Sequence, residues 1–272
     1  MRAAPAPIAD WQPVYYLDCG ADLHAALALA HLFAGGGRVA CVAADGGVHD
    51  PLMTALTLVD LIAMFGKTDV PVVGASAAIS SVPARRTQAS QINSIGLPAS
   101  DGRVLTTAAP VMLARLTRRY PGRLRVIALG SLANLAQAIR HDPALPSLVH
   151  SVTVLDAHPD HRVQSPVRTR VLDAGWPVSV VPRSLGASTV LDEDDRIRLG
   201  GQGGAGYLLG AMLFQRDDAV GTPTTTSSPL HGAVTAAVAE RQIPTTTFIR
   251  NRLLRPAGGS TGDALTTRIR AA

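Results

Sequence analysis

The sequence predicts an α/β protein with a mostly parallel central sheet and helices on both faces of that sheet. Short apolar runs of strand length alternate with longer runs whose apolar residues recur at helical spacing. Glycines close several of the helical runs. Hydrophobic residues make up 47% and charged residues 17% of the 272 residues, which supplies enough apolar material for a large buried core.

The first part of the chain reads as β-α-β-α-β. Val14–Leu17 is a short apolar strand, and Ala25–Phe33 is a run of helix-forming residues that three glycines follow. Arg38–Ala43 is the second strand, Leu52–Phe65 has apolar residues at helical spacing, and 69–75 is the third strand. Because helices connect successive strands, we expect the strands to be parallel.

The alternation continues to the end of the chain. We expect further strands over 123–130, 151–157 and 177–182. We expect helices over 109–120, 131–140, 166–175, 192–198, 210–216 and 230–241. The remaining segments are expected as a loop or excursion over 76–103, a flexible Gly-rich interruption over 200–206 and a small-polar linker over 220–229. The tail from Arg255 reads as a short strand or a disordered segment.

No repeat and no shift in composition marks a domain boundary. We therefore expect one α/β domain over 1–272, with 1–12 and 256–272 flexible or peripheral. The N-terminal stretch lacks an apolar core of signal-peptide length, and no uninterrupted apolar run reaches the roughly 20 residues needed to cross a bilayer. These features predict a cytoplasmic protein without a membrane partner.

The formal net charge is +5, with Lys67 as the only lysine. The arginines are scattered along the chain in short pairs and are not interleaved with aromatic residues, so we expect no nucleic-acid partner. Two cysteines, Cys19 and Cys41, are too few for a disulfide scaffold, and we expect buried thiols. A disulfide between them is possible only if their strands are neighbours.

Four polar loops follow four of the predicted strands. In an open parallel sheet, ligands bind at the carboxyl ends of the strands, so these loops should meet at one edge. They are 18–24, 45–50, 130–134 and 156–161. Loops are polar by default, so a single one carries little weight, but four at one edge indicate a site.

The order of several segments resembles the calcium-dependent nucleoside hydrolase family. "YYLDCGADLHAALALA" is similar to the family's opening strand, its Asp-x-Asp-Pro-Gly-x-Asp-Asp loop and the helix that follows. "VACVAADGGVHDPLMTALTLVDLIAMFGKTDVPVVGA", "VIALGSLANLAQAIRHDP", "VSVVPRSLGASTVLDEDD" and "SPLHGAVTAAVA" resemble later segments in the same order. The resemblance implies an α/β fold, a ribose-bearing ligand and a homo-oligomer.

The positions that carry the family's calcium chemistry differ here. An ungapped match places Asp18 on the first aspartate of the loop but puts Gly20, His24 and Ala25 on three further aspartates. His231 matches a family histidine, and Gly232 stands where the following calcium aspartate would be. The family's Gly-Gly-Asn turn becomes 46–48 of this chain, ending in valine, and its Glu-Phe-Asn stretch has no counterpart.

Because Ca²⁺ takes six to eight oxygen ligands, these changes predict that the family's calcium site is lost, and we expect neither a metal nor a cofactor. The remaining polar groups at the edge are the candidates for a site. The predicted catalytic residues are Asp18, Asp22 and His231, and the predicted substrate-binding residues are His24, Asp45, Asn134, Asp156, His158 and His161.

Structural roles compete with these assignments. Asp22 suits a helix N-cap, His24 suits a first-turn packing position, and Asn134 and Asp45 suit bonds that fix their own loops. Two functions follow. One is a diverged, calcium-independent protein that binds or acts on a nucleoside or other ribose-bearing molecule, with N-glycosidic chemistry as the reaction class. The other is a non-catalytic homologue that serves as a ligand-binding or protein-partner scaffold.

Overall fold

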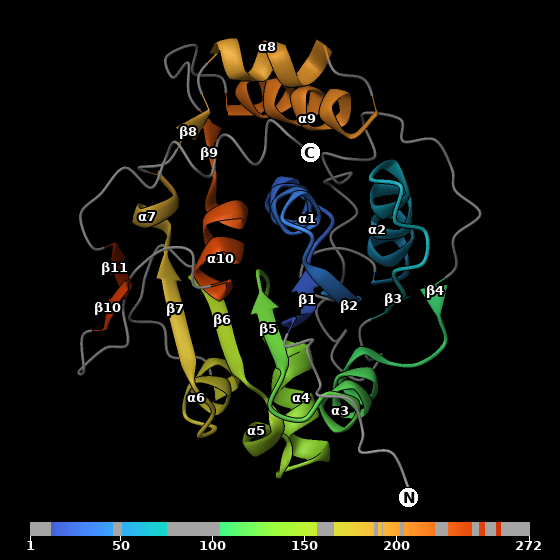
Figure 1. Cartoon of the computed structure of the whole chain (residues 1–272), viewed down its shortest axis with the longest axis vertical. Coiled ribbons are helices and arrows are strands. Elements are labelled where there is room, and N and C mark those ends of the chain that lie inside the picture. Colours follow the sequence, from blue (N-terminus) through green and yellow to red (C-terminus); the bar gives the residue numbers. More distant parts are fainter. Residues whose placement is uncertain are drawn as a thin grey trace, which may run out of the picture.

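A computed structural model describes residues 12–45, 51–74, 104–156, 166–187, 190–191, 193–201, 204–220, 228–240, 245–247 and 254–256. Its centre is a seven-stranded parallel sheet in the order β4-β3-β2-β1-β5-β6-β7 (Figure 1). The strands are β1 (Val14–Cys19), β2 (Arg38–Ala44), β3 (Val72–Val73), β4 (Val104–Leu105), β5 (Leu124–Ala128), β6 (Ser151–Asp156) and β7 (Val178–Pro182). The predicted fold class is confirmed, and every strand pair in this sheet is parallel.

Helices cover both faces of this sheet. The helices are α1 (Leu23–Ala34), α2 (Pro51–Met64), α3 (Ala109–Arg119), α4 (Ala133–His141), α5 (Leu145–Leu148), α6 (Pro166–Leu172), α7 (Arg183–Ala187), α8 (Glu193–Gly201), α9 (Gly204–Val220) and α10 (His231–Ala239). Two short antiparallel pairs complete the described elements: β8 (Val190–Leu191) with β9 (Ser228–Pro229), and β10 (Thr245–Thr247) with β11 (Leu254–Pro256).

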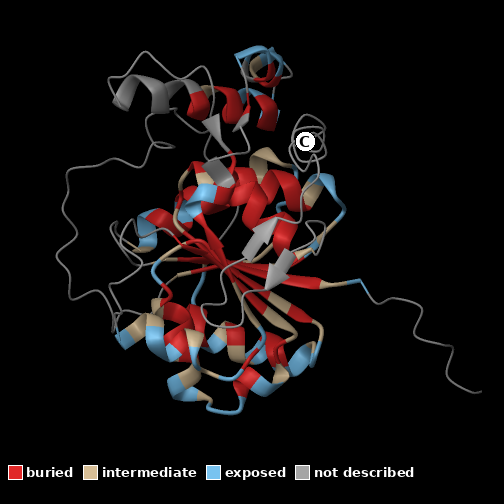
Figure 2. Cartoon of the chain, turned by 90° about the vertical axis from the view of Figure 1, so that its left-hand side faces the viewer, coloured by how far each residue is buried: buried red, intermediate tan, exposed pale blue. Residues whose placement is uncertain are grey.

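Strand β1 lies in the middle of the sheet and is buried along its whole length (Figure 2). Its side chains alternate between two apolar clusters, because successive residues of a strand point to opposite faces. Tyr15, Leu17 and Cys19 join the cluster formed with α1, α2, α9 and α10. Val14 and Tyr16 join the cluster formed with α3, α4 and α6.

The two cysteines lie on opposite faces of the sheet. Cys19 is in the α1 cluster, Cys41 is in the α3 cluster, and both are free and buried. Burial raises the pKa of the Cys41 thiol to about 12, so this thiol stays protonated at neutral pH. The disulfide that the sequence left open is therefore not formed.

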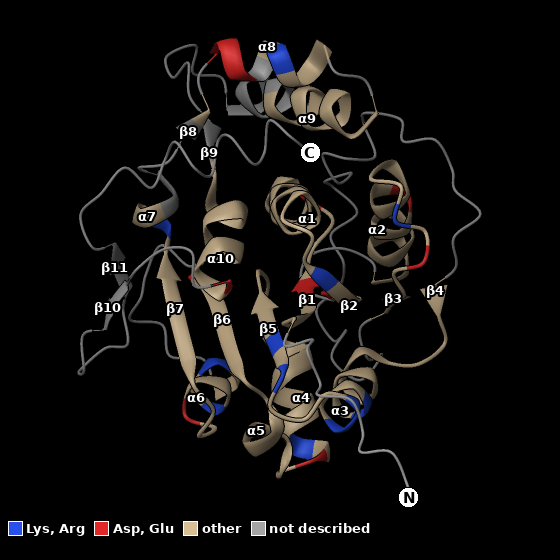
Figure 3. Ribbon diagram, in the orientation of Figure 1, with Lys and Arg blue, Asp and Glu red and all other residues tan. Residues whose placement is uncertain are grey.

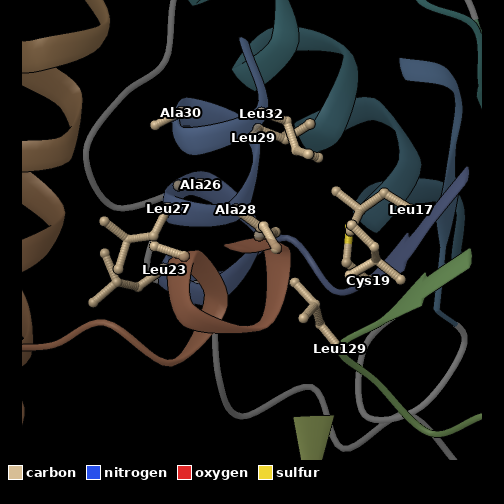
Figure 4. Close-up of a cluster of buried hydrophobic side chains, with 14 of the residues drawn as sticks. Leu17, Cys19, Leu23, Ala26, Leu27, Ala28, Leu29, Ala30, Leu32 and Leu129 are labelled. Carbon is tan, nitrogen blue, oxygen red and sulfur yellow. The ribbon is translucent and has the colours of Figure 1, made fainter. Parts of the chain in front are cut away.

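Helices α1 and α10 form the tightest helix pair near the sheet. Every residue of α10 is buried, which fits a helix enclosed between α1 and strands β5, β6 and β7. Figure 4 shows the leucines and alanines of α1 in this core, with Leu17 and Cys19 of β1 close by. At the other end of the pair, the buried His31 Nε2 lies 3.1 Å from Glu240 Oε2, directly after α10.

The glycine-rich stretch separates two helices, and those helices extend further into it than predicted. Gly200 and Gly201 end α8, and Gly204 begins α9, so only 202–203 lie outside the described residues. Buried apolar side chains such as Leu199 and Leu208 pack these helices against the core, and this packing overrides the low helix propensity of glycine. Segments α5, α7 and β8 were not predicted, and the whole of the predicted excursion over 76–103 lies outside the described residues.

Candidate functional site

The candidate site lies where the chain reverses its direction across the sheet. From β1 the chain builds β2, β3 and β4 on one side, and β5, β6 and β7 then follow on the other side. The crevice beyond the carboxyl ends of such neighbouring strands is the usual ligand site of open α/β sheets. Asp18, one residue before the end of β1, lies at this point, paired with Ala43 on β2 and Ala128 on β5.

Backbone hydrogen bonds fix Asp18 between the two neighbouring loops. Its carbonyl accepts from the Leu129 amide at 2.8 Å, and the next carbonyl, of Cys19, accepts from the Asp45 amide at 2.8 Å. The side chain of Asp18 is only 3% exposed. The alternation of β1 turns it toward the face that α3 and α4 cover.

Asn134, in the first turn of α4, meets Asp18 from that face. Its Nδ2 donates to Asp18 Oδ1 at 3.0 Å and to the Ala44 carbonyl at 3.1 Å. Leu132, which precedes α4, has φ +63°, a left-handed conformation that costs a residue with a side chain about 1 kcal/mol or more. The sharp turn brings Asn134 into the sheet edge, where it is 1% exposed.

Two oxygens of this pair have no hydrogen-bond partner among the described residues. Asp18 Oδ2 and Asn134 Oδ1 are both buried and accept no hydrogen bond from the part of the chain that the structure describes. A buried acceptor left without a donor costs about 1–3 kcal/mol. Such atoms in a native fold call for an explanation, and a bound molecule that donates hydrogen bonds is one.

Asp45, directly after β2, is held by the loop after β5. Its Oδ2 accepts from the Ser131 amide at 2.7 Å, and its Oδ1 accepts from the Ser131 hydroxyl at 2.6 Å. Gly130 makes room for this arrangement, because a Cβ there would coincide with the Asp45 carboxylate. Asp45 thus joins two loops of the edge, whereas its competing interpretation expected bonds within its own loop.

The pKa of the Asp18 carboxyl is raised well above its ordinary value. Burial is the main cause, and the charge of Asp45 adds to it, while the hydrogen bond from Asn134 opposes it. Removal of a carboxylate from water disfavours its charged form. Asp18 therefore remains a neutral acid over a wider pH range than an exposed aspartate.

On the α1 and α10 side of the edge, the predicted residues make capping and packing contacts. Asp22 is the N-cap of α1 and its Oδ1 accepts from the Ala25 amide at 3.0 Å. His24 and the buried His231 meet edge to face, with ring centroids 5.3 Å apart. Gly232 lies against the His24 backbone so closely that a Cβ would coincide with the His24 carbonyl oxygen.

The predicted residues therefore fall into separate groups. Asp18, Asn134 and Asp45 form one group, and Asp22, His24 and His231 lie at the starts of α1 and α10. Buried Asp156, at the end of β6, faces Arg168 of α6 at 3.2 Å instead of joining either group. His158 and His161, and the 46–48 turn, lie outside the described residues.

Sequence reasoning missed Gly130 and Ser131. Both belong to the "GSLAN" segment, where only Asn134 was selected. A glycine followed by a hydroxyl residue at the end of a strand was the available signal, but nothing local identifies Asp45 as the partner. In the described part of the chain, no group of three or more His, Cys, Asp and Glu side chains could hold a metal ion, and no helix is long and apolar enough to span a membrane.

The fold is similar to that of solved nucleoside hydrolases. A plant nucleoside hydrolase, PpNRh1, is similar to this chain with a TM-score of 0.76 and 16% identity over 96% of this chain and 99% of its own. The purine-preferring ribonucleoside hydrolase from Gardnerella vaginalis has a TM-score of 0.74 and 14% identity, over 94% of this chain and 98% of its own.

A family model for inosine-uridine preferring nucleoside hydrolases matches residues 15–157. The chain belongs to this family, as the resemblance in its sequence predicted. The type III effector XopQ, in a structure complexed with adenosine diphosphate ribose, is also similar, with a TM-score of 0.72 and 14% identity over 95% of this chain and 92% of its own. No curated protein matches the chain.

Proposed function

We propose that this chain binds a ribose-bearing small molecule beside Asp18 and Asn134, and that it does so without calcium. The observation that carries the proposal is the pair of buried oxygens without donors, Asp18 Oδ2 and Asn134 Oδ1. A ribose diol offers two hydroxyl donors at neighbouring carbons, so one sugar can satisfy both acceptors. The position at the reversal point of a parallel sheet supports a ligand site there.

The protonation of Asp18 supports a neutral ligand. Because burial raises its pKa, the carboxyl can donate a hydrogen bond as well as accept one. A sugar hydroxyl can take either role.

The residues present do not suit a calcium ion. Ca²⁺ requires about six to eight oxygen ligands. The described side chains at the edge offer Asp18, Asn134, an Asp22 carboxylate whose Oδ1 caps α1, and an Asp45 carboxylate already bonded to Ser131 at both oxygens. Gly232, which the family resemblance places at a calcium aspartate, has the His24 backbone where a side chain would begin. We therefore derive no step through a metal ion.

A second candidate function is hydrolysis of an N-glycosidic bond in the same ligand. His231 favours it, because a buried histidine in contact with His24 at the starts of α1 and α10 can protonate a leaving base. In that reaction the C1′–N bond breaks and the base leaves with a proton from His231. A water oxygen bonds to C1′, and the proton that this water loses returns to His231. Asp22 serves this reaction poorly, since it caps α1. A non-catalytic role is the alternative.

Calorimetry in the presence of a calcium chelator tests the binding proposal. Ribose, adenosine and adenosine diphosphate ribose are the ligands, the last because XopQ has been seen in complex with it. We expect heat from at least one of them with the wild-type chain and a loss of affinity of about tenfold or more in Asn134→Ala, since each removed hydrogen bond to a buried group costs about 1–3 kcal/mol.

Asp22→Asn is the matched control, because asparagine also caps helices. Circular dichroism establishes that each variant is folded. Absence of heat with all three ligands, or equal binding by Asn134→Ala, would contradict the proposal. Release of free base from adenosine by the folded wild-type chain, lost in His231→Ala, would establish the second candidate function.

A further inference from the structure

Five arginines gather at the amino edge of the sheet, opposite the candidate site. Arg38 begins β2, Arg123 precedes β5, and Arg115, Arg118 and Arg119 lie in the second half of α3. The start of β1 pairs with Arg38 on one side and with Leu124, next to Arg123, on the other. Figure 3 shows the basic residues of α3 at this end of the molecule.

Tyr120, the C-cap of α3, is the centre of this surface. Arg38 Nη2 and Arg119 Nε each donate to the Tyr120 hydroxyl oxygen at 3.2 Å. Their guanidinium carbons lie 5.4 and 5.7 Å from the centroid of the Tyr120 ring. The tyrosine therefore holds two cationic groups at one point of the surface.

Carboxylates do not neutralise this pair. Arg118 is ion-paired with Asp142 at 2.7 Å, and among the described residues neither Arg38 nor Arg119 forms an ion pair with a carboxylate. The Glu240 carboxylate, which lies beside Gly37, is bonded to the buried His31 instead. Two like charges at one phenol oxygen repel each other, and an anion bound between them would remove that repulsion.

The geometry suits phosphate more than other anions. The arginine guanidinium matches a phosphate in a two-point contact and keeps its charge at every relevant pH. The basic groups extend along α3 and across the start of the sheet, which suits a chain of phosphates better than a single one. The exposed large apolar side chains of the described residues lie elsewhere, except Val111 in the first turn of α3. Docking of a protein or a membrane would need such apolar anchors.

We propose that this surface, formed by Arg38, Arg115, Arg118, Arg119, Tyr120 and Arg123, binds the phosphate backbone of a nucleic acid. The sequence predicted no such partner because its arginines appear scattered. The fold brings Arg38 next to residues more than 75 positions later in the chain, as the Arg38–Tyr120 hydrogen bond shows (82 positions apart). The surface is independent of the proposed ribose site, which lies at the opposite edge.

Fluorescence anisotropy with a short labelled single-stranded RNA tests this proposal on the full chain. The variant is Arg38→Gln with Arg119→Gln. The control is Arg170→Gln with Arg198→Gln, which removes the same charge from exposed positions on α6 and α8. We expect the first pair to weaken binding about tenfold and to lower the slope of log affinity against log salt by about 1.4, since each phosphate contact contributes about 0.7 for single strands. The control pair should change neither the affinity nor the salt slope by more than about twofold.

Thermal unfolding establishes that both double variants are folded. Equal weakening by the two pairs would overturn the proposal, because it would show attraction to net charge alone. Absence of wild-type binding at low salt would also overturn it. So would a poly-glutamate peptide that competes as well as the RNA does, since the surface would then recognise acidic protein. Adenosine should leave RNA affinity unchanged, whatever the outcome at the ribose site.

Discussion

The two sides of the carboxyl edge differ in how their buried groups are packed. On the α4 side, Asp18 and Asn134 are buried with two oxygens left without donors. On the α1 and α10 side, Gly232 meets the His24 backbone directly and the helices pack without space for a further group between them. The family resemblance assigns calcium carboxylates to both sides, so this difference separates a side with unpaired buried oxygens from a side closed by helix packing.

The comparison teaches that two positions which the resemblance assigns to calcium carboxylates differ physically. Glycine at position 232 lets the neighbouring helix approach and fill the space. A carboxylate that stays, as at Asp18, remains buried and must be neutral, paired or bound. Variants that disturb each side separately can break or sharpen the distinction.

The largest effect is expected from Gly232→Asp. The new side chain begins where the His24 carbonyl lies, so α10 must move away from α1. Overpacking of this kind costs about 3 kcal/mol of unfolding free energy. Urea unfolding measures the loss, and Gly200→Ala is the control because nothing lies near its Cβ position. Restoration of stability by added calcium would contradict the account of this side as a closed helix contact.

Asn134→Ala should have the next largest effect on stability. It removes the donors to Asp18 Oδ1 and to the Ala44 carbonyl, both of which are buried. Leaving those acceptors unsatisfied should lower the unfolding free energy by about 2 kcal/mol. The measurement is urea unfolding at neutral pH. A change smaller than that of an exposed substitution such as Arg170→Gln would show that Asn134 is not part of a fixed network.

Gly130→Ala tests whether the space at Gly130 is needed for the Asp45 carboxylate to bond to Ser131. A methyl group at position 130 would displace the Asp45 carboxylate from Ser131 and should cost about 1 kcal/mol. Because the clash is with one side chain, the cost should shrink in the Asp45→Ala background. A double-mutant cycle by chemical unfolding measures this coupling. Equal costs in both backgrounds would place the strain in the backbone of the loop.

The smallest effect is a change in the pH profile of Asp18→Asn. A folded pKa above the unfolded value of about 3.9 means that the native state holds the proton more tightly. The stability that protonation of Asp18 contributes is fully present below the pKa of the unfolded state. It is lost as the pH rises through the pKa of the folded state. Asparagine cannot ionise, so its stability relative to wild type should increase from acid to neutral pH.

Unfolding at a series of pH values checks this prediction. Asp22→Asn is the matched variant, because it removes one carboxylate and asparagine also suits an N-cap. If the Asp18→Asn difference from wild type did not change with pH, the raised pKa assigned to the Asp18 carboxyl would be wrong.

Much of the fold was predictable because its signal is local. The strands around β1 and the helices α1 and α3 are strong apolar runs with clear ends, and their alternation gives the parallel sheet. The site was predictable only as a set of loops at one edge. Asn134 was selected for its resemblance, but its hydrogen bond to Asp18 joins residues 116 positions apart. The Gly232 contact and the Asp45–Ser131 link are also long-range, and no local pattern reports them.

The central claim is that the chain binds a ribose-bearing ligand without calcium. It is tested most directly by measuring the affinity for adenosine, or for whichever ribose ligand binds, first with millimolar calcium and then with a chelator. The account predicts affinities within about twofold of each other, because the ligand hydroxyls bond to Asp18 and Asn134 and no ion lies between them. Binding that appears only with calcium, tenfold or more tighter than with the chelator, would contradict it.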